Sequence, residues 1–243
     1  MECLFSDNAV IPCNCVIFNN LTCGFSNSDY DSPVRPPATR NLAFTLIELL
    51  AVVAIIAILV GLLFPAFKAV QNQARQTQAK NDLTQIVNAV NAFYTDYGKY
   101  PIVTADATYG STTIPNNDLL YTLRAVALLS NANNAANPRQ IPYISPPDVK
   151  NPTNPRSGIA TQAAGSIPAG EFVDPWGAAY KVRIDGGYDN QVANPYTANA
   201  GATPNLQIGV IAWSVGVDGS GPPAVPGGDK NTGVFADDVI SWQ

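Results

Sequence analysis

Residues 44–67, FTLIELLAVVAIIAILVGLLFPAF, decide the organisation of the chain, because Thr45 and Glu48 are their only clearly polar side chains. As an α-helix these 24 residues extend about 36 Å, which exceeds the roughly 30 Å hydrocarbon core of a bilayer. The stretch therefore predicts a transmembrane helix. A plain anchor has no use for Glu48, and a carboxylate inside such a helix usually marks a function.

The residues around Glu48 resemble a processing signal. Ala43, Phe44 and Glu48 lie in the run AFTLIE, which follows two arginines and precedes the apolar run. This pattern is similar to the class III signal of type IV pilins and of type II secretion pseudopilins. The resemblance implies that a prepilin peptidase cuts between Ala43 and Phe44 and methylates the new amino terminus. Pro65 stands where many helices of this family have a kinking proline.

Cleavage before Phe44 gives Glu48 a charge of opposite sign. The new ammonium group starts four residues before the carboxylate, so each subunit brings one positive and one negative group into apolar surroundings. Pairing between neighbouring subunits would set the register of their helices, because a slipped subunit leaves two buried charges uncompensated. In the alternative interpretation, Glu48 lies at the headgroup boundary of an uncleaved signal anchor.

The composition argues against nucleic-acid binding and catalysis. The chain has 13 Lys and Arg, 18 Asp and Glu, and no His. Two of these basic and four of these acidic residues precede Phe44, which leaves 11 and 14 in the processed chain. Nucleic-acid binding depends on clustered basic side chains, which are lacking here. Because the commonest general base is also absent, we expect neither an enzyme nor a nucleic-acid partner.

All four cysteines precede the proposed cut, at Cys3, Cys13, Cys15 and Cys23. The processed chain therefore forms no disulfide. Many type IV pilins close a C-terminal loop with a disulfide, whereas major pseudopilins generally do not, so the pattern favours a pseudopilin. The leader, residues 1–43, is long for this class, and either a later start codon near Val34 or a disordered prefix explains its length.

The flanking charges predict the topology. Arg35 and Arg40 precede the apolar run, and acid-rich sequence follows it. By the positive-inside rule the leader lies in the cytoplasm and the C-terminal part in the periplasm. We expect a single-pass inner-membrane protein that enters a periplasmic filament after processing.

Beyond the apolar run, residues 68–97 contain no Gly or Pro and continue the helix. Apolar residues recur there at spacings of three, four and seven, which predicts a helix with one face against a globular domain. Gly98 and Pro101 end it. The apolar positions are Leu83, Ile86, Val87, Val90, Phe93, Tyr94 and Tyr97.

Residues 98–243 are expected to form the periplasmic globular domain. The run DPWGAAY at 174–180, followed by an alternating strand at 181–184, resembles the start of the pseudopilin sheet. A second strand is predicted at 206–214. Residues 102–170 look like an insertion with a short helix at 118–130 and an extended surface loop from 131 onward. A small antiparallel sheet packed on a long helix gives an α+β, pilin-like fold.

The C-terminal stretch holds a second candidate site. Asp218, Asp229 and Asp238 lie in Gly-rich or acidic segments that resemble the calcium loop of type II major pseudopilins. The resemblance implies a structural calcium ion, for which carboxylate and backbone oxygens, such as that of Val215, are suitable ligands. Without the resemblance these residues are ordinary acidic turn residues.

Together these features predict a non-catalytic subunit of a type II secretion pseudopilus. The resemblance implies a homopolymeric filament, and as partners the prepilin peptidase, the assembly platform and ATPase of the inner membrane, and minor pseudopilins. Two alternatives stay open: a type IV pilin for adhesion, motility or DNA uptake, and a membrane-tethered periplasmic binding module that never polymerises.

Overall fold

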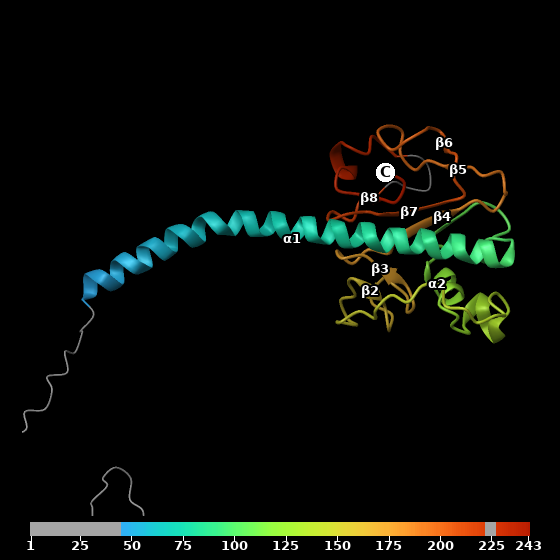
Figure 1. The fold of residues 1–243 in the computed structure, drawn as a ribbon, viewed down its shortest axis with the longest axis horizontal. Helices are drawn as coiled ribbons and strands as arrows, with labels where there is room; N and C mark the ends of the chain where they lie inside the picture. Colours follow the sequence, from blue (N-terminus) through green and yellow to red (C-terminus); the bar gives the residue numbers. More distant parts are fainter. Residues whose placement is uncertain (1–44, 222–226) are drawn as a thin grey trace, which may run out of the picture. The chain divides into compact units, whose positions relative to one another are not determined.

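The structure is a computed structural model that describes residues 45–221 and 227–243. The leader and the proposed cleavage residues Ala43 and Phe44 lie outside the described residues. The chain divides into two units after Ala51, and the second unit, Val52–Gln243, contains every described strand. The fold is α+β, as predicted, with a long first helix and small antiparallel sheets (Figure 1).

Helix α1 (Leu46–Tyr97) is continuous through residue 65, so Pro65 does not end it. The kink expected at Pro65 stays a prediction. By length and composition α1 is able to cross a membrane. All side chains described between residues 46 and 64 are exposed. The apolar run therefore has no protein partner within the described part of the chain.

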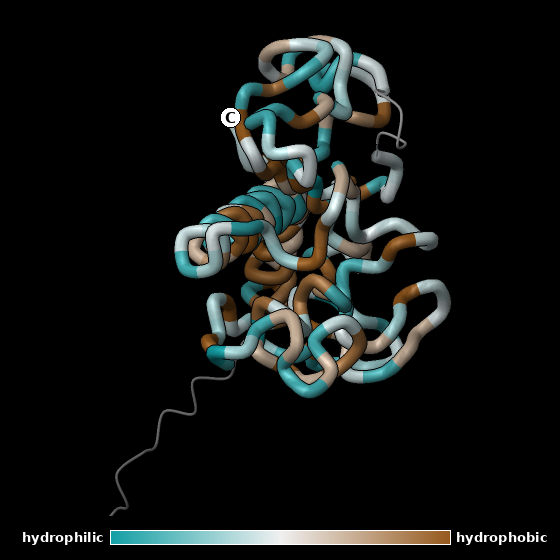
Figure 2. Tube along the Cα trace, turned by 90° about the vertical axis from the view of Figure 1, so that its right-hand side faces the viewer, coloured by the Kyte–Doolittle hydropathy of each residue, from teal (hydrophilic) through white to brown (hydrophobic). Residues whose placement is uncertain are grey.

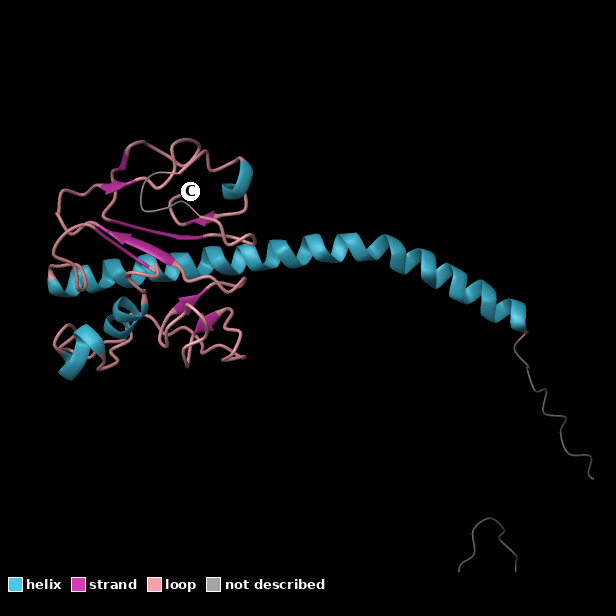
Figure 3. Ribbon diagram, turned by 180° about the vertical axis from the view of Figure 1, so that it is seen from behind, coloured by secondary structure: helices cyan, strands magenta, loops and turns pink. Residues whose placement is uncertain are grey.

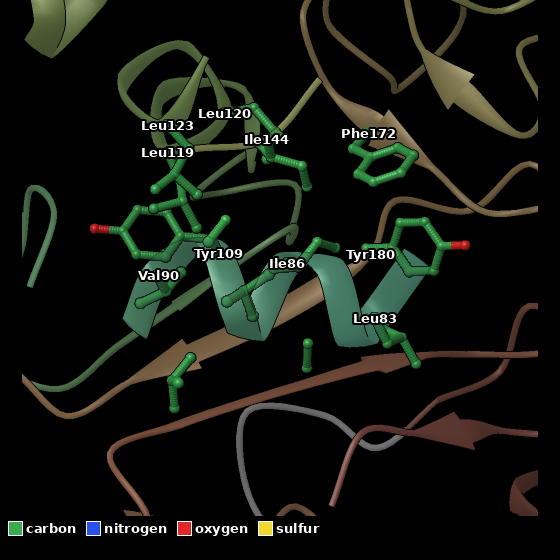
Figure 4. Close-up of a cluster of buried hydrophobic side chains, with 14 of the residues drawn as sticks. Leu83, Ile86, Val90, Tyr109, Leu119, Leu120, Leu123, Ile144, Phe172 and Tyr180 are labelled. Carbon is green, nitrogen blue, oxygen red and sulfur yellow. The ribbon is translucent and has the colours of Figure 1, made fainter. Parts of the chain in front are cut away.

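The second half of α1 supplies the centre of the main hydrophobic core. Leu83, Ile86, Val90 and Phe93 are at most 1% exposed, which confirms the predicted apolar stripe. Figure 4 shows the first three of these side chains among residues from distant parts of the domain, namely Tyr109, Leu119, Leu120, Leu123, Ile144, Phe172 and Tyr180. Tyr94 differs from the prediction, because 40% of it is exposed and its ring stacks on Tyr100 instead.

A four-stranded antiparallel sheet packs on this stripe. Its order is β1 (Ala107–Tyr109), β4 (Lys181–Ile184), β7 (Val210–Ser214) and β8 (Val239–Ile240). Because side chains alternate along a strand, each strand contributes to both faces of the sheet. Val182 and Ala212 are paired in the β4–β7 register and belong to the core beside α1. Trp213, the next residue along β7, belongs to a second cluster.

The predicted strand at 206–214 is in fact two strands. Leu206 belongs to β6 (Asn205–Leu206), which pairs with β5 (Val192–Ala193), and β7 begins only at Val210. Leu206 therefore lies in the second cluster and not on the face shared by Val210 and Ala212. Gly209 lies between the two strands and packs closely against Tyr100. A Cβ atom at this position would lie 2.0 Å from the Tyr100 hydroxyl oxygen.

Residues 102–170 are more than an exposed insertion. The predicted helix at 118–130 is shorter, as α2 (Asn117–Leu123), and a 3₁₀ segment, η1 (Leu129–Asn134), follows it. Strand β2 (Gly158–Ile159) pairs with β3 (Phe172–Val173). Ile144, Val149 and Ile159 are buried, so the expected surface loop is wrong for these positions. An extended chain without regular structure can still bury side chains, which composition alone does not reveal.

The second half of α1 lies between two groups of segments. Figures 1 and 3 show α2, β2 and β3 on one side of this half, and β5, β6 and β8 on the other. A short 3₁₀ turn, η2 (Gly233–Phe235), precedes β8. In Figure 2 hydrophobic positions gather inside the domain beside the helix, and hydrophilic positions prevail on the outer loops.

The DPWG turn is organised by one carboxylate. Asp174 is fully buried. Its Oδ1 accepts the N–H groups of Trp176, Gly177 and Ala178 at 2.7–2.9 Å, and its Oδ2 accepts the hydroxyl of Ser214 at 2.6 Å. Burial raises the pKa of Asp174, and the four hydrogen bonds oppose this shift. The carboxylate therefore joins the turn before β4 to the end of β7.

The substitution Asp174→Ala tests this role. It removes the acceptor of four hydrogen bonds, which come from the buried Ser214 hydroxyl and from three partly buried N–H groups. We expect the free energy of unfolding to fall by about 3 kcal/mol or more, since a hydrogen bond to a charged group contributes roughly 1.5–3 kcal/mol. Urea unfolding of the full chain in detergent micelles, followed by tryptophan fluorescence, measures the change.

Asp148→Ala is the matched control. The Asp148 side chain is 62% exposed and its contact with Arg124 is 3.9 Å long, so we expect a change within about 0.5 kcal/mol. Equal effects of the two substitutions would contradict the role assigned to Asp174.

Candidate functional site

The first candidate site lies at the start of α1, where Thr45 and Glu48 bond reciprocally. The Glu48 Oε2 atom accepts the Thr45 N–H at 2.9 Å and the Thr45 hydroxyl at 2.7 Å, and Thr45 Oγ1 accepts the Glu48 N–H at 3.3 Å. This is a capping box, which satisfies helix N–H groups that have no intrahelical acceptor. The T-x-x-E spacing of Thr45 and Glu48 is its sequence signature.

The capping box places the Glu48 carboxylate at the helix start. The backbone N–H that it accepts belongs to Thr45, the residue directly after Phe44. A negative charge there is also favoured by the helix dipole. The same carboxylate is thus suited to hold the positive amino group that the predicted cleavage before Phe44 would create, in its own subunit or in a neighbour.

The surface beyond the capping box is apolar on all sides. Large hydrophobic side chains from Leu46 to Val70 are 50–82% exposed. Exposed apolar area of this extent is unfavourable in water and marks a membrane or protein interface. Lipid and other copies of the same helix are both suitable surroundings.

The second candidate site is a group of aspartates near the C-terminus. Asp238 is buried, its Oδ2 accepts the Tyr196 hydroxyl at 2.6 Å, and its Oδ1 has no hydrogen-bond partner among the described residues. Burial raises the pKa of Asp238 to about 7; the negative charges of Asp237 and Asp218 also raise it, while the Tyr196 hydroxyl and Lys230 lower it. The three carboxylates therefore act on one another.

Asp237 is the member of this group that the sequence had not identified. Its Oδ2 accepts the backbone N–H groups of Val217 and Asp218, so it ties the loop after β7 to the segment before β8. The neighbouring acids in the run ADDV were the available signal. Asp218 itself is exposed and its Oδ1 accepts the Ser220 N–H at 2.7 Å.

Asp229 has different surroundings. Its Oδ1 accepts the Asn199 side-chain amide at 2.8 Å and the Asn231 N–H at 2.9 Å. These hydrogen bonds lower the pKa of Asp229, and Asp229 is not among the charges that act on Asp238. The structure thus brings Asp218 and Asp238 together with Asp237 and gives Asp229 partners of its own.

The donor set has the chemistry that a hard cation requires. Asp238 offers a buried oxygen without a hydrogen-bond donor, and calcium prefers carboxylate and carbonyl oxygens. The parts of the chain described by the structure contain no group of three or more Asp, Glu, His or Cys side chains arranged around one point. A cation here would therefore be held by fewer than three of these carboxylates and would need backbone oxygens as further ligands.

Lys80 fixes the end of the chain against α1. Its Nζ donates to the carbonyl of Ile240 at 2.6 Å and to the carbonyl of Gln243. Partial burial lowers the pKa of Lys80. The residues that follow the aspartate pair are thereby attached to the helix, so the position of the acidic group depends on α1.

One comparison with known proteins identifies the N-terminal site. A family model described as the prokaryotic N-terminal methylation motif matches residues 39–64, which include Ala43, Phe44 and Glu48. No curated protein and no solved structure gives a significant match. The motif implies processing by a prepilin peptidase and assembly into a filament, and the apolar helix within it suggests membrane anchoring. It supports assignment of the chain to the type IV pilin-like proteins.

Proposed function

We propose that the chain is a structural, non-catalytic subunit of a type II secretion pseudopilus. The observation that carries the proposal is a prepilin signal joined directly to an apolar helix whose described side chains from 46 to 64 are all exposed. Such a helix needs lipid before assembly and equally apolar packing after it. The filament core supplies that packing, with copies of α1 side by side.

In this proposal the charges at the helix start determine the assembly register. The amino group of Phe44 pairs with Glu48 of a neighbouring subunit, since two opposite charges in apolar surroundings are tolerated only when they are paired. The globular domains form the outer surface in the periplasm. The prepilin peptidase, the inner-membrane platform, its ATPase and minor pseudopilins are the expected partners.

Three features favour a pseudopilin over a type IV pilus subunit. No cysteine follows residue 43, the DPWG turn precedes β4, and an acidic group lies near the C-terminus. A non-polymerising tethered module remains the alternative from another class. Deletion of the gene separates these functions: we expect loss of protein export into the medium with surface pili unchanged. Loss of pili with export intact would favour the type IV pilus.

Processing is the first testable consequence. In native membranes we expect a chain that begins at N-methylated Phe44, and in cells without prepilin peptidase activity a chain that keeps Arg40–Ala43. Intact mass and N-terminal peptide analysis distinguish the two. A chain that keeps the leader in both strains would overturn the filament proposal.

Substitution at Glu48 tests the charge separately from the cap. Glu48→Gln retains the capping box, because Gln also serves at that position, but it removes the negative charge. We expect Glu48→Gln to be cleaved normally and to form no filament. Thr45→Ala weakens the cap by about 1 kcal/mol and leaves the charge, so filaments should persist.

Electron microscopy of sheared filaments and immunoblots of the membrane fraction provide the measurements. If Thr45→Ala blocks assembly and Glu48→Gln does not, Glu48 acts as a cap and the charge-pairing proposal is wrong.

We also propose that Asp218 and Asp238, together with backbone oxygens, hold a structural calcium ion. A ligand that binds only the folded state raises stability, by about 2.7 kcal/mol when its concentration is 100 times Kd. The melting temperature of the full chain in detergent should therefore rise with calcium relative to chelator. Asp238→Asn should abolish the rise, and Asp229→Asn should preserve it. An equal melting temperature with calcium and with chelator would refute the site.

A further inference from the structure

We propose that a groove beside the C-terminal end of α1 binds a neutral saccharide chain. The groove has a volume of about 550 Å³, within the range of small-molecule sites. It lies between the flank of α1, the turn between β6 and β7, and the last residues of the chain. Its lining residues are Val87, Asn91, Tyr94, Thr95, Tyr100, Asn190, Gln207, Ile208, Gly209, Val210, Ser241 and Trp242. The proposal is independent of filament assembly.

Stacked tyrosines form one wall of the groove and its extension. The ring centroids of Tyr94 and Tyr100 are 4.5 Å apart with an interplanar angle of 25°, and those of Tyr100 and Tyr188 are 5.6 Å apart with an angle of 22°. Tyr94 and Tyr188 are 40% and 48% exposed. The Tyr94 and Tyr188 rings are tilted by 32° to each other, so the three rings form a stacked row with exposed aromatic area that a ligand can cover.

The aromatic wall is held in place by the backbone. The Tyr188 hydroxyl accepts the Tyr100 N–H at 3.1 Å. Tyr188 has a φ of 59°, an uncommon conformation for a bulky residue. Gly209 lies against the Tyr100 hydroxyl so closely that no side chain fits there. A wall fixed before binding loses little conformational entropy when a ligand arrives.

Side-chain amides surround these rings and are available to a ligand. Asn91, Asn190 and Gln207 are exposed, and their side-chain amides donate or accept no hydrogen bond within the described part of the chain. Each amide carries both donors and an acceptor. Hydroxyl groups, which also donate and accept, are the complementary partner.

The charge of the lining determines the ligand class. Within the described part of the chain, no Asp, Glu, Lys or Arg side chain lines this groove. Two other pockets include charged groups, Lys181 and Glu171 in one and Lys80, Lys230 and Asp238 in the other. A nucleotide would stack on the tyrosines but needs cations for its phosphate. A pyranose ring offers a flat C–H face for the rings and hydroxyls for the amides, without charge.

Calorimetric titration of the full chain tests the proposal. The detergent must lack a sugar headgroup, so a zwitterionic one is used. The probes are cellohexaose, mannohexaose and N-acetylated chitohexaose, which distinguish plain hexose chains from amino-sugar chains of the cell envelope, with hexagalacturonate as the charged counterpart. We expect at least one neutral probe to bind and hexagalacturonate to bind less well.

Variants place the binding in the groove. Tyr94→Ala should weaken it about tenfold, the equivalent of roughly 1.4 kcal/mol, and Tyr94→Phe should retain it because the ring remains. Asn91→Ala should weaken it to a smaller extent. Leu128→Ala, at a side chain that is 50% exposed outside the groove, is the matched control. Unchanged melting temperatures show that the variants are folded.

Three results would overturn the proposal. No binding of any neutral probe, or binding that Tyr94→Ala and Asn91→Ala leave unchanged, excludes a saccharide in this groove. Stronger binding of hexagalacturonate than of every neutral probe contradicts the charge argument. Self-association that Tyr94→Ala abolishes, without saccharide binding, assigns the surface to a second copy of the chain.

Discussion

Packing of one stripe of α1 against the sheet is the contact on which the rest of the domain depends. Leu83, Ile86 and Val90 are fully buried, and they join the sheet to segments from residues 102–180 that otherwise lie on the far side of the helix. Complete burial of such a side chain contributes about 1.5–3 kcal/mol. The sheet and these segments therefore share one core around the helix, whereas β5 and β6 contribute to the second cluster.

The two halves of the continuous helix α1 have different surfaces. Its first half is apolar around the whole circumference, and its second half is apolar on one stripe only. A stripe is sufficient for a helix on a globular domain, whereas all-round apolarity requires lipid or surrounding helices. The position at which the pattern changes, after Pro65, is therefore the boundary between the two roles that we propose.

The spacing of apolar residues correctly predicted those elements that bury one face against the domain core. The stripe from Leu83 to Phe93 and the strand at 181–184 were of this kind. It failed where a particular contact overrides the pattern: Tyr94 stacks on Tyr100, and the turn at Gly209 divides the expected strand so that Leu206 enters another cluster. Neither the stacking contact nor the turn can be recognised from the spacing of apolar residues in the sequence.

The candidate sites were predictable to different degrees. Glu48 was evident as a charge in an apolar run, but its capping partner Thr45 follows only from a spacing rule. Asp218 and Asp238 were identified by resemblance, while Asp237 was missed because adjacent acids do not reveal which one faces the loop. The three uncharged amides around the stacked tyrosines come from separate segments, at residues 91, 190 and 207. No local sequence motif therefore predicts the groove.

The surroundings of Asp238 differ from those of the buried Asp174, although Asp185 also has a buried carboxylate oxygen without a hydrogen-bond partner among the described residues. Asp174 and the partly buried Asp82 accept hydrogen bonds from neutral donors. Asp174 receives four such hydrogen bonds, and Asp82 receives the Tyr180 hydroxyl at 2.8 Å. Asp238 has a single donor, a second oxygen without one, and two carboxylates nearby. In the absence of a cation this arrangement opposes folding when Asp238 is charged, because desolvation and repulsion act together. A bound cation offsets both effects, which is why this group, and not the more deeply buried Asp174, is the site to which we assign calcium.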